Sequence, residues 1–145
     1  MYSVLIIDDE KPVSDMLRQA LMKHDYNVET ACNGKEGTEK FDGGFYDIVI
    51  TDIIMSGVDG NDVVRYIRES KKPLTPVLGI SGTPWLLEEN SFDAVLAKPF
   101  SIHTMLTTIQ NLRPKESLQG IVARVQKVTD LVSENTITEQ KVLSR

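Results

Sequence analysis

The regular alternation of strand-like and helix-like segments constrains the fold of this chain more than any other feature. The run Asp47–Thr51 is apolar or β-branched on both of its faces, which is expected of a strand buried in a parallel sheet with helices on each side. Strands are predicted over Ser3–Ile7, Asn27–Ala31, Asp47–Thr51, Pro76–Ile80 and Ala94–Ala97. Helices are predicted over Lys11–His24, Gly34–Phe41, Asn61–Glu69 and Ile102–Leu112. Strands that alternate with helices in this way predict an α/β fold, a doubly wound five-stranded parallel sheet with right-handed crossovers.

The pattern changes after Arg113-Pro114. Apolar residues continue at helical spacing, at Leu118, Ile121, Val122, Val125, Val128 and Val132. They predict about four turns of amphipathic helix, which either packs on the surface of its own domain or serves as a dimerising or linking helix. Residues 133–145 show no clear pattern. We therefore expect one domain over 1–113 and, over 114–145, a helical extension or a linker to an absent output segment.

Composition argues against several classes of protein. The 145 residues suit one compact domain. No run approaches the roughly 18 apolar residues of a membrane helix, and the first residues lack the pattern of a signal peptide. Cys32 is the single cysteine, so no internal disulfide can form, which fits a reducing cytoplasm. A net charge of −5 argues against direct binding of nucleic acid, which draws on clustered Lys and Arg.

Carboxylates gather where predicted strands end. Asp8 and Asp9 follow the first strand and Asp52 follows the third. In open α/β sheets a site lies outside these ends, so the three groups converge if the two strands are neighbours. Their mutual repulsion would raise at least one pKa unless a cation neutralises them, and an all-oxygen cluster selects a hard cation such as Mg²⁺. A lone Asp would be read as a solvent-facing strand end, but three on one edge favour a site.

Two further polar residues belong to the same edge. Ser81 ends the fourth predicted strand, and Lys98 ends the fifth in the run Lys98-Pro99, where the proline stops the strand abruptly. A hydroxyl and an ammonium beside a carboxylate cluster make sense if one carboxylate becomes an acyl phosphate, because both could neutralise or donate to phosphoryl oxygens.

Over about residues 2–112 the sequence resembles the receiver domain of two-component response regulators, a flavodoxin-like (βα)5 fold. The resemblance rests on Asp8-Asp9, Asp52, Met55 with Asp59-Gly60, Ser81 and Lys98-Pro99-Phe100. It implies that Asp52 is a phosphoacceptor, the nucleophile that attacks a phosphohistidine of a partner, either a sensor histidine kinase or a phosphotransfer protein. Asp9 and Asp52 would ligate Mg²⁺ with help from Asp8 and the backbone carbonyl of Ile54. Lys98 would pair with the phosphoryl group, and Ser81 would move to hydrogen-bond it.

The sequence also departs from this family. Val95 stands where Tyr or Phe usually partners the switch hydroxyl, and Ser56 stands where proline is common. Ser81 and Lys98 are only 98 − 81 = 17 positions apart, which shortens the fourth helix to one or two turns with Thr83-Pro84 as N-cap and N1. No DNA-binding pattern follows. The usual readout face, formed by the fourth helix, fifth strand and fifth helix, is therefore altered, and a homodimer could form through this face or through the tail helix.

Two apolar residues near these motifs carry hypotheses of their own. Trp85, in the shortened segment, is interpreted as a core residue in preference to a partner hot spot. Ile54, two residues after Asp52, cannot orient a hydrolytic water, so we expect slow loss of the phosphoryl group.

Two other functions compete with the phosphorylated switch. A phosphohydrolase of the dehalogenase type needs a second Asp two residues past the nucleophile, and Ile54 stands there. A receiver that has lost phosphorylation and acts only as a docking module is disfavoured by the retained Asp8, Asp9, Asp52, Ser81 and Lys98, although Val95 leaves it open.

Overall fold

The computed structural model describes residues 1–87, 91–113 and 118–143. By their internal contacts, Met1–Arg113 and Pro114–Arg145 form two compact units. The proposed junction after Arg113 includes residues 114–117, which lie outside the described residues.

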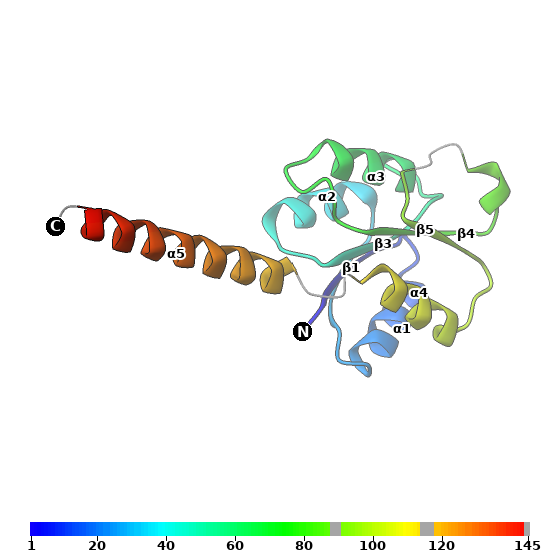
Figure 1. The fold of residues 1–145 in the computed structure, drawn as a ribbon. Coiled ribbons are helices and arrows are strands. Elements are labelled where there is room, and N and C mark those ends of the chain that lie inside the picture. Colours follow the sequence, from blue (N-terminus) through cyan, green and yellow to red (C-terminus); the bar gives the residue numbers. More distant parts are fainter. Residues whose placement is uncertain (88–90, 114–117, 144–145) are drawn as a thin grey trace. The chain divides into compact units, whose positions relative to one another are not determined.

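The first unit is built on a single sheet of five parallel strands (Figure 1). The strands are β1 (Ser3–Ile7), β2 (Asn27–Ala31), β3 (Ile48–Asp52), β4 (Val77–Ser81) and β5 (Ala94–Ala97). Their order is β2-β1-β3-β4-β5, so the chain first winds to one side of β1 and then to the other. This reversal places a topological switch point between β1 and β3. The predicted doubly wound parallel sheet is confirmed.

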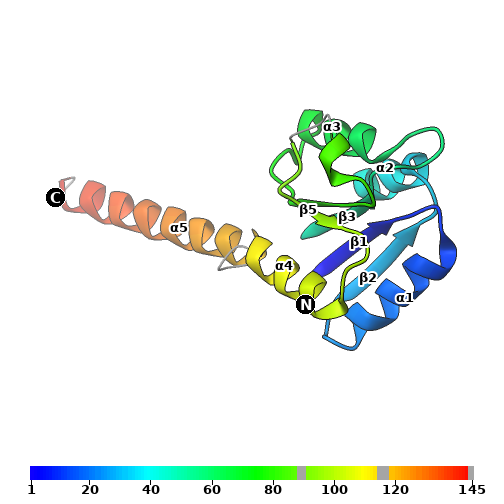
Figure 2. The ribbon, with the colours of Figure 1, turned by 90° about the vertical axis from the view of Figure 1, so that its right-hand side faces the viewer.

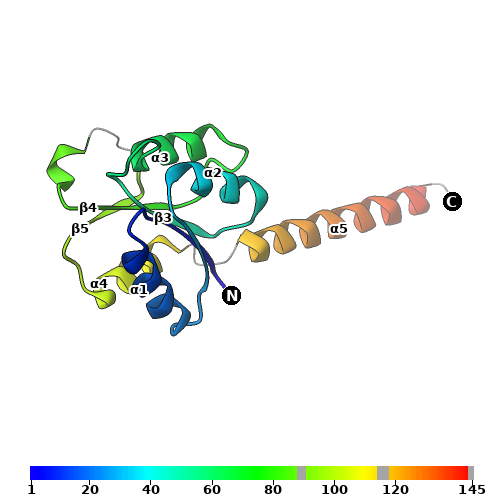
Figure 3. The same cartoon turned by 180° about the vertical axis from the view of Figure 1, so that it is seen from behind.

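Helices cover both faces of this sheet (Figure 2; seen from behind in Figure 3). One face carries α1 (Lys11–Met22) and α4 (Ile102–Leu112), and the other carries α2 (Gly34–Gly43) and α3 (Gly60–Glu69). Alternate residues of each strand point to opposite faces. Thus Val4 and Ile6 of β1 join the core beneath α1 and α4, whereas Leu5 and Ile7 join the core beneath α2 and α3.

Short polar side chains fix where three of the helices begin. Asn33 accepts the N–H of Glu36 at 2.8 Å and so caps α2. Ser101 accepts the N–H of Thr104 at 3.0 Å and caps α4. At α3, Asp59 and Asp62 form a reciprocal capping box, which satisfies donors that the first helical turn cannot satisfy itself. The box matters for the site because it anchors the loop that follows β3.

The connection between β4 and β5 is indeed short. Its described residues include one 3₁₀ turn, η1 (Pro84–Leu86), while residues 88–90 lie outside the described part. Thr83 precedes this turn as predicted but makes no side-chain capping bond. The interpretation of Trp85 as a core residue is wrong, since it is 76% exposed. A single 3₁₀ turn is too short to bury the large indole ring of Trp85 against the sheet.

The second unit is the helix α5 (Leu118–Leu143), 26 residues long. It therefore continues through most of the stretch after residue 132 for which the sequence showed no pattern. Among the described residues, no helix is both long enough and apolar enough to cross a membrane.

Candidate functional site

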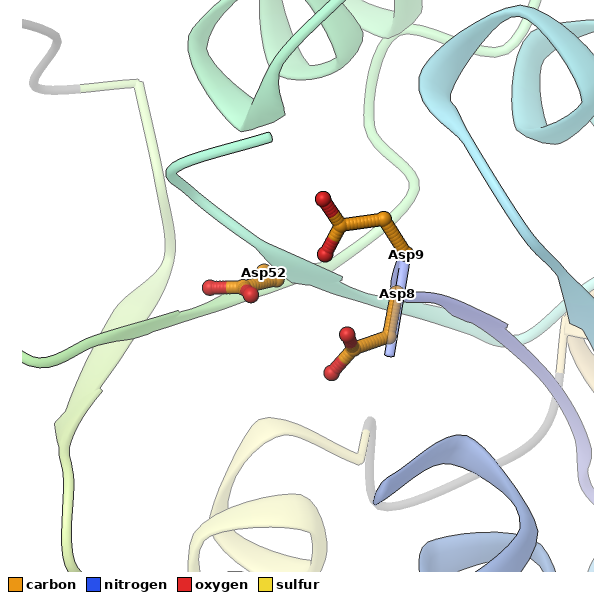
Figure 4. Close-up of side chains that lie close together, drawn as sticks. All are labelled: Asp8, Asp9 and Asp52. Atoms are coloured by element: carbon orange, nitrogen blue, oxygen red, sulfur yellow. The ribbon is translucent and has the colours of Figure 1, made fainter. Parts of the chain in front are cut away.

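Three carboxylates meet at the carboxyl end of the sheet. Asp8 and Asp9 follow β1, and Asp52 is the last residue of β3. These strands are adjacent and parallel, with Ile7 paired to Thr51, so their ends lie side by side. One oxygen from each carboxylate lies within 4.8 Å of the others (Figure 4). The structure thus brings together the groups that the sequence placed at strand ends.

Asp8 is buried and held by the backbone around it. The residue is only 1% exposed. Its Oδ1 accepts the N–H of Glu10 at 2.8 Å, and its own N–H donates to the carbonyl of Ala31 at 3.1 Å. Its Oδ2 is buried with no hydrogen-bond partner among the described residues. Such an oxygen is costly to leave unsatisfied, and a bound cation would satisfy it.

Burial perturbs the acidity of this cluster. It raises the pKa of Asp8 from 3.8 to about 6, against the lowering effect of the Glu10 N–H and with a further rise from the charge of Asp52. Burial also raises the pKa of Asp52, and the Lys98 ammonium opposes this. The rise expected from mutual repulsion is present, but removal from water is its larger cause.

Lys98 supplies a positive side-chain charge to the site. Its Nζ lies 3.3 Å from Oδ2 of Asp52, whose side chain is 8% exposed, against 32% for that of Lys98. The lysine follows directly on β5, and its N–H donates to the carbonyl of Ser81 at 2.9 Å. This bond belongs to the last pair of the β4–β5 ladder, Ser81 with Ala97, and the Lys98 side chain reaches across β4 to the end of β3. The Lys98-Pro99 peptide is cis.

Ser81 lies at the same edge, with its hydroxyl turned to the following loop. It is the last residue of β4 and is 2% exposed. Its Oγ accepts the N–H of Thr83 at 3.0 Å, so the hydroxyl is engaged by the backbone of its own loop.

The loop after β3 is held unusually close to Asp52. The N–H of Gly60 donates to the carbonyl of Ile53 at 2.8 Å. A Cβ at Gly60 would lie 2.5 Å from the carbonyl oxygen of Asp52 and 2.6 Å from the Cα of Ile53. Only glycine permits this approach. Sequence reasoning used Asp59-Gly60 as a motif but missed this positioning role, although a glycine at the start of a predicted helix was a usable signal.

An aromatic ring packs over Gly79, the residue of β4 that pairs with Val95. Val95 is half-buried in β5 and pairs with Gly79 of β4. A Cβ on Gly79 would have no room, since it would lie 3.0 Å from the ring of Phe92 and 2.9 Å from Cδ1 of Ile53. Phe92 thus fills the space above Gly79, next to the residue that follows Asp52. This contact was not predictable from the sequence, because Phe92 precedes the strand and belongs to no motif.

The residues present fit a hard divalent cation. Asp8, Asp9 and Asp52 offer only carboxylate oxygens, which Mg²⁺ prefers as ligands. Asp8 Oδ2, which has no hydrogen-bond partner among the described residues, could serve as one of these ligands. The side chain of Ile54 is 66% exposed, so it points away from the core on the loop that begins beside Asp52.

Comparison with known proteins identifies the family of this chain. The sequence model of the response regulator receiver domain matches residues 4–110. The transcriptional regulatory protein TrcR of Mycobacterium tuberculosis is 28% identical over 142 residues, which cover 94% of this chain and 55% of TrcR. The chain therefore spans little more than half the length of that relative.

Solved structures extend the comparison to three dimensions. The response regulator TrrA of Thermotoga maritima, in complex with Mg²⁺-BeF, superposes with a TM-score of 0.71 at 30% identity, covering 77% of this chain and 99% of TrrA. TrrA in complex with the histidine kinase ThkA gives a TM-score of 0.69 at 30% identity, covering 77% of this chain and 98% of that one. With the family match spanning residues 4–110 of 145, the chain belongs to the response regulator receiver domain family of two-component signalling.

Proposed function

We propose that this chain is a phosphoacceptor in a two-component phosphorelay and that Asp52 takes up the phosphoryl group. One observation carries the proposal: the nearly buried Asp52 carboxylate lies 3.3 Å from the Lys98 ammonium and within the cluster that Asp8 and Asp9 complete. A nucleophile, a fixed positive charge and a set of oxygen ligands are what phosphoryl transfer needs from a protein.

The transfer step follows from these groups. An oxygen of Asp52 attacks the phosphorus of a phosphohistidine on the partner. The P–O bond forms as the P–N bond breaks, and the imidazole leaves after taking a proton from solvent. Lys98 then faces one oxygen of the resulting acyl phosphate. Ser81 would exchange its bond with the Thr83 N–H for one to another phosphoryl oxygen, and this movement would pass the signal on.

Asp8, Asp9, Asp52 and the backbone carbonyl of Ile54 would hold Mg²⁺. When bound, Mg²⁺ supplies positive charge to the phosphoryl oxygens as negative charge develops on them. The four oxygens come from the ends of β1 and β3 and from the loop after β3, which the Gly60 contact holds in place.

The donor would be a sensor histidine kinase or a phosphotransfer protein. The similarity to TrrA, which has been crystallised with the histidine kinase ThkA, supports this choice. In this proposal residues 1–113 form the receiver, and residues 114–145 form an extension or a linker to an output segment.

A second candidate is a docking module that works without phosphorylation. The observation that favours it is Val95, which offers no ring to a switching hydroxyl. Phe92, which packs above Gly79, precedes β5 and so does not occupy the position of Val95.

One assay separates the two. The full chain is incubated with acetyl phosphate and Mg²⁺, and its mass is followed with time. A base-labile adduct of one phosphoryl group that is absent in Asp52→Asn and retained in Asp130→Asn supports the phosphoacceptor. The docking module predicts no adduct in any of the three proteins.

A further inference from the structure

Gly34, the first residue of α2, packs against the loop after β3 (residues 53–59) with no space for a side chain. A Cβ on Gly34 would lie 2.2 Å from the carbonyl oxygen of Val58, 2.6 Å from its Cγ1 and 2.8 Å from its Cβ. Gly34 is buried, and the one described glycine with a positive φ is Gly57. The contact therefore requires glycine at the start of α2 for space and not for backbone conformation.

The contact with Gly34 adds a long-range anchor to a loop whose far end is fixed locally. The Gly60 N–H donates to the carbonyl of Ile53 at 2.8 Å, and the Asp59 capping box ties the last residue of the loop to α3. Gly34 comes instead from α2, which follows β2 in the chain. It meets the loop at Val58, the residue before the capping residue. Both α2 and α3 therefore hold the loop in place.

The loop has more freedom to yield at this contact than α2 has. A Cβ on Gly37 would lie 2.4 Å from Cδ1 of Ile7 in β1, and Phe41 is 1% exposed, so α2 is seated closely on the sheet. In the loop, Ser56 and Gly57 are exposed, and a Cβ on Gly57 would meet nothing within 4 Å. A side chain added at the start of α2 would therefore displace the loop.

A displaced Val58 would disturb the part of the loop beside the site. The separation of 2.2 Å must grow to at least 3.0 Å before the new Cβ and the carbonyl oxygen of Val58 can coexist. On the C-terminal side of Val58 the capping box fixes the loop to α3, so residues 54–57 take up the movement. This stretch carries the carbonyl of Ile54, the backbone ligand proposed for Mg²⁺.

We propose that Gly34 is a positioning residue for the magnesium site: through Val58 it holds the loop after β3 so that the Ile54 carbonyl remains available to the cation. Residues outside the ligand set that orient a ligand in this way tune the affinity for the metal. Gly34 touches neither the carboxylates nor a phosphoryl group, so its effect is on the binding of Mg²⁺. This inference rests on the function proposed above, because it takes the Ile54 carbonyl as a ligand of Mg²⁺.

Titration of the ¹⁵N-labelled full chain with Mg²⁺, followed by amide chemical shifts, tests the proposal without any phosphoryl donor. Gly34→Ala should bind Mg²⁺ about tenfold more weakly than the wild type, as on loss of a contact that orients a metal ligand. Gly43→Ala is the matched control: it makes the same substitution in the same helix, where a Cβ meets nothing within 4 Å, and should bind Mg²⁺ as the wild type does. Wild-type affinity in Gly34→Ala would overturn the proposal, as would an equal loss in the control.

Val58→Gly is a second variant that adds no atom to the contact, so its result does not depend on whether Gly34→Ala folds. It releases the loop from α2 and should also weaken the binding of Mg²⁺, whereas unchanged affinity would overturn the proposal. In the double variant the side-chain contacts at 2.6 and 2.8 Å are gone, so it should bind Mg²⁺ no more weakly than Gly34→Ala alone. Losses of affinity that multiply would show two independent effects and would contradict the proposal.

The same titrations separate this proposal from the function on which it rests. If the wild type binds Mg²⁺ and takes a phosphoryl group on Asp52 while Gly34→Ala binds Mg²⁺ equally well, the proposed function stands and the role of Gly34 is refuted. If Mg²⁺ shifts no amide signal of Asp8, Asp9 or Asp52 in the wild type, the metal site is refuted and this proposal with it.

Discussion

The Nζ of Lys98 lies 3.3 Å from Oδ2 of Asp52, which joins the residue after β5 to the last residue of β3 across the strand between them. The Lys98 N–H is bound to the carbonyl of Ser81 at 2.9 Å, so the three strand ends are tied together. A phosphoryl group added to Asp52 would therefore meet a positive charge that is already in position.

Replacing Lys98 should slow phosphorylation. In Lys98→Ala the acyl phosphate loses its fixed counter-charge, and we expect the rate with acetyl phosphate and Mg²⁺ to fall about 100-fold, as on loss of one stabilising group in a preorganised site. Lys98→Arg keeps the charge and should recover part of the rate. Equal rates for Lys98→Ala and the wild type would show that the ion pair has no role in the transfer.

The pH dependence of stability should reveal Asp8. Its folded pKa of about 6 lies above the ordinary value of 3.8, so the folded protein binds more protons between these values. The free energy of unfolding of the metal-free protein must then fall as the pH rises through this window, by at most about 3 kcal/mol. The raised pKa of Asp52 acts in the same direction.

Urea unfolding with a chelator, from about pH 4.5 to about pH 7.5, measures this effect. Asp8→Asn has no such proton to lose, so it should gain stability relative to the wild type as the pH rises. At pH values above the pKa of Asp8, Mg²⁺ should restore the free energy of unfolding of the wild type. It should have less effect on the stability of Asp8→Asn. Parallel curves for the two proteins would exclude Asp8 as the group responsible.

Gly60 should be indispensable to the loop after β3. In Gly60→Ala the new Cβ would lie 2.5 Å from the carbonyl oxygen of Asp52, so the helix start and the strand end must move apart. We expect a loss of about 1–3 kcal/mol in the free energy of unfolding and slower phosphorylation of Asp52. Gly43→Ala is the control, because a Cβ there meets nothing within 4 Å. A Gly60→Ala protein as active as the control would show that the loop position does not matter.

Ile54 should set the lifetime of the phosphorylated form. Its exposed apolar side chain, two residues after Asp52, cannot hold a water for hydrolysis, whereas Asn could. Ile54→Asn should lose the phosphoryl group about tenfold faster, and Ile54→Val should behave like the wild type. The phosphorylated proteins are freed of donor and followed by mass, and unchanged decay in Ile54→Asn would refute the idea.

The strands could be located from the sequence because each is a short run with polar ends. The bounds of β1, β2 and β5 were predicted as observed, while β3 and β4 each begin and end one residue later. Their ends depend on pairing, since Asp52 pairs with Ile80, and pairing is a property of the assembled sheet. The convergence of Asp8, Asp9 and Asp52 was predictable for the same reason that it exists, the parallel course of β1 and β3.

Contacts between segments that carry no motif could not be predicted from the sequence. The ring of Phe92 fills the space above Gly79, and neither residue signals this alone. Trp85 was assigned to the core by its apolar character, yet it lies on a single turn that cannot cover it. The last part of α5 lacks a hydrophobic period, so its helical state comes from continuation of the helix before it.

The most direct test of the central claim is to identify the modified residue. The chain is phosphorylated with acetyl phosphate and Mg²⁺ and treated with borohydride, which reduces an acyl phosphate of Asp to homoserine, and its peptides are sequenced by mass spectrometry. We predict homoserine at position 52 alone and none in Asp52→Asn. Homoserine at Asp8 or Asp9, or no homoserine in a wild-type protein shown to be folded and to bind Mg²⁺, would contradict the account.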